Sequence, residues 1–402
     1  MVSTQESAAQ RLATAPHFSI HSWLLGQTSL PPRVRRALRD SLSDYRSDEA
    51  HARIAEIGRL VAPLFGTATS PMLLPGNATE ALETVLVNLT SPGDAVGVVA
   101  GGAFGNRLVD MAVAWQREVR VLRHADDTVV IPRDVATFVR ANLDLRALLL
   151  VHTEIGTGAH MDLAAVAAAV HSTGHMPLLV VDVASSLGAA PIQLDNWGLD
   201  AAVGNSQKAL GGPVGLAFAA LSERAMDAVE HVSSPRFARD LRMVRRYAAR
   251  YETPYAVSTP LLGALTEALR LLHEEGLQRV YDRHRTLSRL AYGGVRAAGL
   301  VPQVPQAMAA PGVTVARLPV GLDSQMMREE LERTHGVLLA DGRGALAGKT
   351  VRIGHLGPLA TEQALTEALA AMRLVVHEQV QRRDAGRCSA APYPPPATVT
   401  AL

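Results

Sequence analysis

The chain has 402 residues, of which 48% are hydrophobic and 19% are charged, and its formal net charge at pH 7 is +1. This length predicts two domains with well-buried cores, and the near-neutral charge disfavours binding to nucleic acid or to an anionic membrane. The single cysteine, Cys388, excludes an internal disulfide and fits a reducing cytoplasm. Neither a secretory leader nor a membrane span is indicated by the N-terminal residues or by any apolar run.

Residues 1–20 are expected to form a loose arm that is available to a partner chain, and Pro31-Pro32 marks the start of a predicted helix. From about residue 70 to residue 225, short runs of leucine and β-branched residues alternate with helical patterns. Such runs are typical of parallel strands covered by helices on both faces, which indicates a large α/β domain. The predicted strands are Ala95–Val99, Val119–Leu122, Ala147–Val151, Leu178–Val181 and Ala201–Val203.

A long helical pattern from Leu261 to Leu300 is predicted to lead into a second domain, a small α+β unit. We therefore assign residues 21–265 to a large domain, whose N-terminal segment contributes to the small domain or to a dimer. Residues 266–380 are assigned to the small C-terminal domain. Residues 381–402 include a proline-rich stretch and are expected to form a disordered tail.

Lys208 stands among small residues just downstream of an apolar run. A lysine that is crowded by apolar neighbours and another cation loses its proton near neutral pH, and its amine then becomes a nucleophile toward an aldehyde. Pyridoxal phosphate requires such an amine, together with a carboxylate for its ring nitrogen, surfaces for its ring and a cradle for its phosphate. The sequence offers a candidate for each of these.

Asp182 ends a predicted parallel strand, so its carboxylate is expected at the carboxyl edge of the sheet, where ligands bind in such folds. Its negative charge would keep the ring nitrogen protonated. Ala184 lies two residues further on and faces the same way on an extended chain, so it is predicted to support one face of the ring. Phe104 stands between glycines and is the candidate for the other face.

The predicted phosphate cradle is Gly76-Asn77-Ala78-Thr79, directly before a helical pattern, because free amides at a helix N-terminus attract an anion. Ser206 and Gln207 are further candidates for the phosphate. Arg352 is predicted to hold a substrate carboxylate through a bidentate ion pair, which indicates an amino acid or keto acid as substrate. The histidines show no metal-ligand spacing, so no metal site is expected.

With these segments in one order across roughly residues 20–378, the chain resembles the class V aminotransferases of the fold-type I pyridoxal phosphate enzymes, the group of alanine–glyoxylate and serine–glyoxylate aminotransferases. The matching segments are Gly76–Glu83, Gly102–Arg107, His152–Gly158, Val181–Gly188, Ser206–Ala209 and Arg352–His355. The resemblance implies an α/β fold with a mainly parallel seven-stranded sheet between helices, plus a small C-terminal α+β domain. It also implies a homodimer with active sites at the subunit interface.

The resemblance further implies that Lys208 forms the internal aldimine, that Asp182 meets the ring nitrogen, that Phe104 stacks on the ring and that Arg352 binds the substrate carboxylate. In the segment His152–Gly158, it places Thr157 at the cofactor and Glu154 at the substrate. His152 itself fits equally well at the cofactor or as a satisfied core histidine.

The chain departs from the family pattern at several positions. Ile155 and Gly156 stand where relatives have a threonine and a serine, and Ala184 stands where a valine is usual. Thr253 or Tyr255 is the candidate for reaching the phosphate of the neighbouring subunit. Arg343 resembles an arginine of relatives that act on unusual amines, and it is expected to face the pocket.

The leading hypothesis is transfer of an amino group from a small amino acid to a 2-keto acid such as glyoxylate or pyruvate. An alternative is β-elimination or decarboxylation of a specialised amino acid in secondary metabolism, because loss of the two hydroxyls at Ile155 and Gly156 would suit a bulkier substrate. A third possibility is a non-catalytic binding protein on the same fold, against which the intact Lys208 and Asp182 argue.

Overall fold

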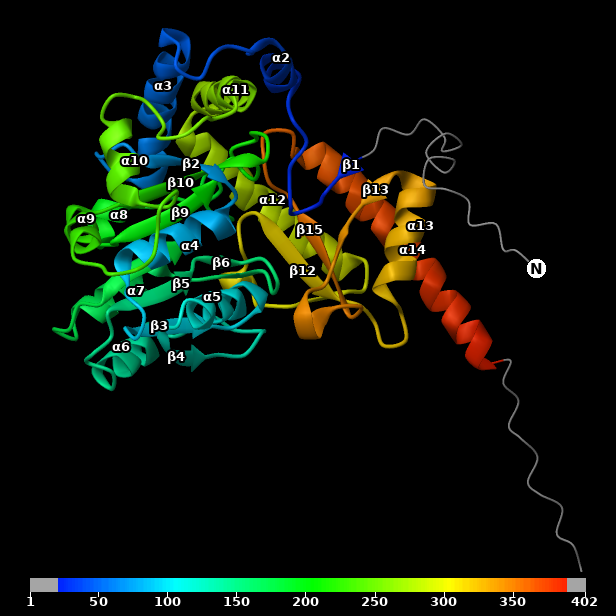
Figure 1. Cartoon of the computed structure of the whole chain (residues 1–402). Helices are drawn as coiled ribbons and strands as arrows, with labels where there is room; N and C mark the ends of the chain where they lie inside the picture. The colour runs from blue at the N-terminus through cyan, green and yellow to red at the C-terminus, as the bar shows by residue number, and fades with distance from the viewer. Residues whose placement is uncertain (1–20, 389–402) are drawn as a thin grey trace, which may run out of the picture.

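The computed structural model describes residues 21–388 and gives the larger domain a seven-stranded sheet (Figure 1). The order of its strands is β2 (Met72–Gly76), β10 (Gly215–Leu221), β9 (Ala201–Asn205), β8 (Leu178–Asp182), β5 (Ala147–Val151), β3 (Ala95–Ala100) and β4 (Glu118–Arg123). Strand β10 runs antiparallel to both of its neighbours, β2 and β9, and all other pairs of neighbouring strands in this sheet are parallel. The expected mainly parallel, seven-stranded sheet is therefore confirmed.

Both faces of the sheet are covered, because alternate residues of the buried strands point to opposite sides. On one face, Leu148, Leu150 and Leu179 pack in a core with α3 (Asp48–Phe65), α6 (Pro132–Arg140), α7 (Leu163–His171) and α11 (Thr259–Glu275). On the other face, Leu149 and Val180 pack with α4 (Ala78–Leu89), α5 (Ala103–Ala114), α9 (Glu223–Glu230) and α10 (Leu241–Ala248). The short helices α2 (Pro32–Asp40) and α8 (Leu194–Trp197) complete this domain.

The smaller domain has a four-stranded antiparallel sheet of order β11 (Val301–Pro302), β12 (Val313–Arg317), β15 (Thr350–Gly354) and β14 (Ala340–Asp341). Its core joins this sheet to α12 (Leu277–Ala297), α13 (Ser324–His335) and α14 (Glu362–Cys388). A short pair, β6 (Thr153–Glu154) and β7 (Ala159–His160), lies in the larger domain, and 3-10 turns occur at Gln306–Met308 and Gly344–Leu346.

The N-terminal segment joins the two domains. Strand β1 (His21–Ser22) pairs in parallel with β13 (Val337–Leu338) of the smaller domain, as Figure 1 shows, and the chain then returns to the larger domain through α2. This arrangement supports the expectation that the N-terminal segment contributes to the small domain. The expected arm at residues 1–20 lies outside the described residues.

Two domain boundaries differ from those expected. Residue 265 falls inside α11, whose apolar side chains as far as Leu272 belong to the core of the larger domain, as does Val280 of α12, so a boundary at residue 265 would divide a helix of that domain. At the other end, α14 continues to Cys388 and so includes the first eight residues of the expected tail, 381–388. Residues 389–402 lie outside the described residues. Within the described residues, no helix is long and apolar enough to span a bilayer.

Candidate active site

A cavity of about 550 Å³ opens at the carboxyl ends of the parallel strands, between the sheet, the N-terminal segment and the smaller domain. This is the edge at which ligands bind in open α/β sheets. The side chains that line it include Leu24, Leu25, Gln27, Asn77, Thr79, Phe104, Arg107, Ile155, Asp182, Ala184, Asn205, Gln207, Lys208, Arg343 and Arg352. Segments that are far apart in the sequence thus meet in one place.

Lys208 lies in the loop between β9 and β10, and its side chain is buried in this cavity. Its Nζ donates a hydrogen bond to Ser185 Oγ at 2.7 Å. Burial is the main reason why the pKa of Lys208 is lowered to about 8. The charge of Asp182 opposes this lowering, and the charge of Arg107 adds to it. A substantial fraction of this amine is therefore uncharged and nucleophilic slightly above neutral pH.

Asp182 is the last residue of β8, and its carboxylate is buried in the cavity. Its Oδ1 accepts a hydrogen bond from the backbone amide of Ala184 at 2.8 Å. Burial raises the pKa of Asp182, while the nearby Lys208 lowers it. A carboxylate in this setting lacks a full set of hydrogen-bond donors, so a cationic or N–H group of a ligand would stabilise it.

Phe104 lies in the first turn of α5, with its ring in the cavity. Lys208 Nζ lies 5.9 Å from the ring centroid, Arg107 Cζ lies 4.6 Å from it and Arg343 Cζ lies 6.0 Å from it. Ala184 lines the same cavity. Phe104 and Ala184 thus border the same cavity, and their contacts with the cofactor ring stay a prediction.

The N-terminus of α4 has a capping box that occupies several of its amides. Asn77 Oδ1 accepts hydrogen bonds from the amides of Thr79 and Glu80, and Glu80 Oε2 accepts one from the amide of Asn77. Within the described residues, the amide of Ala78 has no partner. Arg107 donates to Thr79 Oγ1 at 3.2 Å, which adds a cation to this end of the cavity. The helix N-terminus and the Arg107 guanidinium thus both place positive electrostatic potential at this end of the cavity.

Two buried amide side chains in the same cavity lack partners within the described residues. They are Asn205, through Oδ1, and Gln207, through Oε1. A buried polar atom without a hydrogen bond destabilises the protein by about 1–3 kcal/mol. These atoms therefore indicate that the cavity is built for a polar ligand.

Arg352 enters the cavity from β15 of the smaller domain and is buried. Its Nε donates to the carbonyl of Asp341 at 2.5 Å, and its Nη1 donates to the carbonyl of Ile155 at 3.4 Å. Burial and, to a smaller extent, the nearby charge of Arg343 lower the pKa of Arg352 to about 10. A carboxylate would neutralise this buried guanidinium, which remains protonated at neutral pH.

The comparisons with known proteins agree with this geometry. The sequence profile "Aminotransferase class-V" matches residues 35–364. The chain belongs to the class V aminotransferase family. It is 32% identical to the L-aspartate–glyoxylate aminotransferase of Paracoccus denitrificans, over 85% of this chain and 87% of that protein. It is also 32% identical to the serine–glyoxylate aminotransferase of Methylorubrum extorquens, over 87% of this chain and 89% of that protein.

Among solved structures, the ureidoglycine–glyoxylate aminotransferase of Bacillus subtilis superimposes with a TM-score of 0.83 at 27% identity. The match covers 91% of this chain and 95% of that chain. The expected family and fold class are confirmed, and the protein is a pyridoxal-phosphate-dependent aminotransferase. These relatives are transaminases, so the elimination or decarboxylation alternative gains no support from them.

The residues of the aminotransferase fit its cofactor. Lys208 supplies the amine, Asp182 a carboxylate, Phe104 and Ala184 the apolar surfaces, and the α4 N-terminus with Arg107 an anion site. The orphaned amide oxygens of Asn205 and Gln207 face the same space.

Glu154 differs from the expectation of a substrate contact. Its Oε2 accepts hydrogen bonds from the amides of Phe104 at 2.8 Å and Gly105 at 3.0 Å, and its Oε1 accepts one from Gly156 at 2.9 Å. A Cβ at Gly102 would lie 2.5 Å from the Glu154 side chain, so glycine makes this approach possible. Glu154 therefore caps α5 and positions Phe104, and it does not line the cavity.

Three other predicted residues lie beside the cavity and do not line it. Thr157 and Ser206 are buried with their hydroxyls donating to backbone carbonyls, Thr157 to Glu154 and Ser206 to Pro213 and Leu216. Gly76 has φ +112°, and a Cβ there would lie 2.3 Å from Glu80 Oε2. Its role is to leave room for the capping box.

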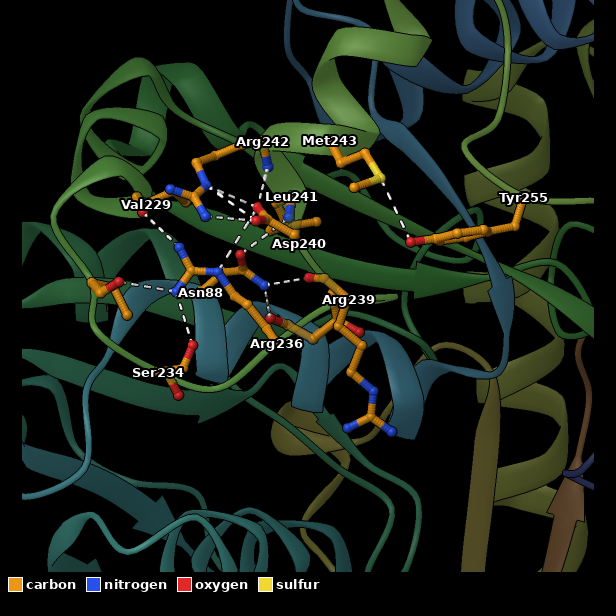
Figure 2. Close-up of polar contacts among 12 residues, drawn as sticks. Asn88, Val229, Ser234, Arg236, Arg239, Asp240, Leu241, Arg242, Met243 and Tyr255 are labelled. Atoms are coloured by element: carbon orange, nitrogen blue, oxygen red, sulfur yellow. Dashed lines mark hydrogen bonds and ion pairs between the residues drawn. The ribbon is translucent and has the colours of Figure 1, made fainter.

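Thr253 and Tyr255 do not line the cavity of their own chain. Thr253 is buried, and its hydroxyl donates to the carbonyl of Tyr255 at 2.7 Å. Figure 2 shows the Tyr255 hydroxyl pointing to Met243 of α10, 3.5 Å from its sulfur. In the same view, Asn88 bonds to the backbone of Arg239 and Leu241 and so fixes the start of α10. Any contact of Tyr255 with phosphate requires a second chain.

His152 is a satisfied core histidine. Its Nδ1 lies 2.9 Å from Ser186 Oγ, and its ring packs on that of His160 with centroids 4.3 Å apart. Burial lowers the pKa of His152 well below its ordinary value. The ring is therefore neutral and does not line the cavity.

Sequence reasoning assigned no role to Arg107, Ser185 or Thr28. Arg107 and Ser185 stand inside matching segments, Arg107 three positions after Phe104 and Ser185 directly after Ala184. Thr28 gave no signal, although its amide donates to the carbonyl of Gln207 at 3.0 Å and its hydroxyl donates to that of Lys208 at 3.1 Å. The N-terminal segment thus holds the loop that carries the amine.

Proposed function

We propose that this aminotransferase moves an amino group from a small amino acid to a 2-keto acid of the glyoxylate or pyruvate type. The observation that carries the proposal is the buried Lys208, with a pKa of about 8, in one cavity with Asp182 and Arg352. The relatives described above act on glyoxylate, and this supports a small acceptor.

Pyridoxal phosphate, when bound, supplies an aldehyde carbon that condenses with amines and a ring that accepts electrons released at the substrate Cα. Lys208 Nζ presents an amine to that carbon and moves the proton at the substrate Cα as general base and acid. Asp182 holds a positive charge at the ring nitrogen, and Arg352 orients the substrate carboxylate.

Other residues bind and enclose the cofactor. Arg107, Thr79 and the α4 N-terminus would hold the phosphate, and Gln207 would add an amide beside Lys208. Ile155 and Leu25 belong to one apolar cluster against Phe104 and exclude water from that wall. Ile155 thus gives the wall an apolar side chain in place of the hydroxyl that relatives have.

The proposal extends to a homodimer with active sites at the interface and to a cytoplasmic location. Phe237 and Tyr255 support the dimer, because both aromatic side chains are exposed, at 76% and 37%, with ring centroids 6.2 Å apart. Large exposed apolar groups that gather in one place are typical of interaction sites. Sedimentation of Phe237→Asp should show loss of the dimer, whereas Val320→Asp, at an exposed site of the smaller domain, should leave it intact.

The decisive experiment uses the two lysines of the chain, Lys208 and Lys349. Purified protein should show a visible cofactor absorbance, and borohydride reduction should fix the cofactor to Lys208 in peptide mapping. Lys208→Ala should lose this fixation and nearly all amino transfer, while Lys349→Ala should retain both, because Lys349 is exposed at the surface. Normal transfer by Lys208→Ala would refute the role.

A further inference from the structure

Among residues 21–388, four cationic side chains line the cavity, but only one carboxylate does. The cations are Lys208, Arg107, Arg343 and Arg352, and the carboxylate is Asp182. Glu154 lies close by, but its oxygens accept three backbone hydrogen bonds from other elements. An excess of positive charge in a partly buried space is costly unless ligands neutralise it.

Three of the four cations have a partner in the proposed function, on which this inference rests. Lys208 reacts with the cofactor, Arg107 stands at the phosphate end beside Thr79, and Arg352 takes the α-carboxylate. Arg343 is left over. Within the described residues it forms no ion pair, and the carboxylate of Asp341, two residues away, is turned to Ser324 and to the amides of Gly342 and Gly348.

The different burial of Arg352 and Arg343 determines how a substrate would be oriented in the cavity. Arg352 is buried and held by two backbone carbonyls, whereas Arg343 is exposed at the start of the 3-10 turn that follows β14. Arg343 and Arg352 both line the cavity, the Arg343 guanidinium lowers the pKa of Arg352, and Arg343 Cζ lies 6.0 Å from the centroid of the Phe104 ring. The two guanidinium groups therefore border one space. A substrate with its α-carboxylate on Arg352 extends its side chain toward Arg343.

We propose that the amino donor is an amino dicarboxylic acid, whose α-carboxylate binds Arg352 and whose side-chain carboxylate binds Arg343. A planar guanidinium pairs with a carboxylate through two parallel hydrogen bonds, which neither an amide nor an alkyl group reproduces. Arg343 is then the residue that selects acidic over neutral donors.

The first test compares donors with the holoenzyme. The kcat/KM of L-aspartate is compared with that of L-asparagine, and the kcat/KM of L-glutamate with that of L-glutamine. In at least one of the two pairs, the acid should exceed its amide by on the order of tenfold or more. Arg343→Gln should remove this advantage and leave transfer from L-alanine within about twofold. The control Arg333→Gln, at an exposed ion pair of α13, should change neither. A wild-type enzyme that prefers neutral donors, or a preference for acids that survives in Arg343→Gln, would overturn the proposal.

A second test needs no turnover and separates this inference from the proposed function. Succinate should bind the holoenzyme on the order of tenfold more tightly than its half-amide, succinamate, in calorimetric titrations, and Arg343→Gln should equalise the two. If the Arg343-dependent preference appears but no donor reacts, the proposed amino transfer fails, whereas the role of Arg343 in binding a second carboxylate stands. If amino transfer proceeds and the two compounds bind equally, the inference fails and the function stands.

Discussion

Glu154 and Phe104 are joined by a hydrogen bond of 2.8 Å, from the Phe104 backbone amide to the buried carboxylate of Glu154. A side chain from β6 thereby fixes the first turn of α5, which carries the aromatic ring proposed to cover the cofactor. Negative charge at a helix N-terminus is stabilised by the helix dipole. Burial raises the pKa of Glu154, whereas the hydrogen bonds from Gly156, Gly105 and Phe104 lower it.

Glu154→Ala should therefore destabilise the protein by about 3 kcal/mol or more, because three buried amides lose their acceptor. The free energy of unfolding, from urea titration of the apoprotein, measures this. Glu118→Ala, which removes an exposed carboxylate paired with Arg120 on β4, should cost about 1 kcal/mol or less. Equal losses in the two variants would contradict the capping role.

The rate at which the apoprotein recovers its cofactor should depend on pH through Lys208. Only the uncharged amine condenses with an aldehyde, and the pKa of Lys208 is lowered by burial to about 8. The rate should rise about tenfold per pH unit below pH 8 and level off above it. Stopped-flow absorbance between pH 6.5 and 9.5 measures the profile, and a rate that still rises about tenfold per pH unit up to pH 9.5 would show that the pKa of the amine is not lowered.

Asp182→Asn should shift that profile to lower pH, because the negative charge of Asp182 raises the pKa of Lys208. Turnover of the reconstituted variant should fall on the order of a hundredfold, since the ring nitrogen loses its charge partner. Asp195→Asn, at the surface in α8, serves as the control for both readouts. A midpoint that moves upward would contradict the assigned geometry.

Thr28→Val should destabilise the apoprotein by about 1 kcal/mol, because the Lys208 carbonyl loses the hydroxyl that donates to it. Thr28→Ser keeps that donor, so its loss of unfolding free energy should be no more than about half of the loss in Thr28→Val. Urea unfolding gives both values. If valine and serine are equivalent, the hydroxyl contributes nothing to holding the loop.

The sequence predicted the residues that meet at the site because each follows a strand that is itself easy to predict. Asp182 ends β8, Phe104 begins the helix after β3 and Lys208 follows β9. Parallel strands bring their carboxyl ends to one edge, so this order along the chain was enough to place these residues together. Arg352 was predicted because a guanidinium pairs with a carboxylate through two hydrogen bonds, and the family resemblance implied the same role.

What remained hidden depends on backbone partners that are distant in sequence. The carboxylate of Glu154 is bound by amides about fifty residues earlier, and no residue pattern marks such a contact. Strand β2 was not predicted either. It contains Pro75, which the sheet tolerates because β2 is an edge strand. The capping box at Asn77 likewise uses amides that sequence reasoning had left free for phosphate.

The pairing of β1 with β13 has a consequence for biosynthesis. Residues 21–22 leave the ribosome early, but their partners at 337–338 follow more than three hundred residues later. Contacts of such long range form slowly, and surfaces that await them are prone to aggregation. Thr28, which clasps the amine-bearing loop, belongs to the same segment, so that segment is anchored at both of its contacts only after residues 337–338 have been synthesised.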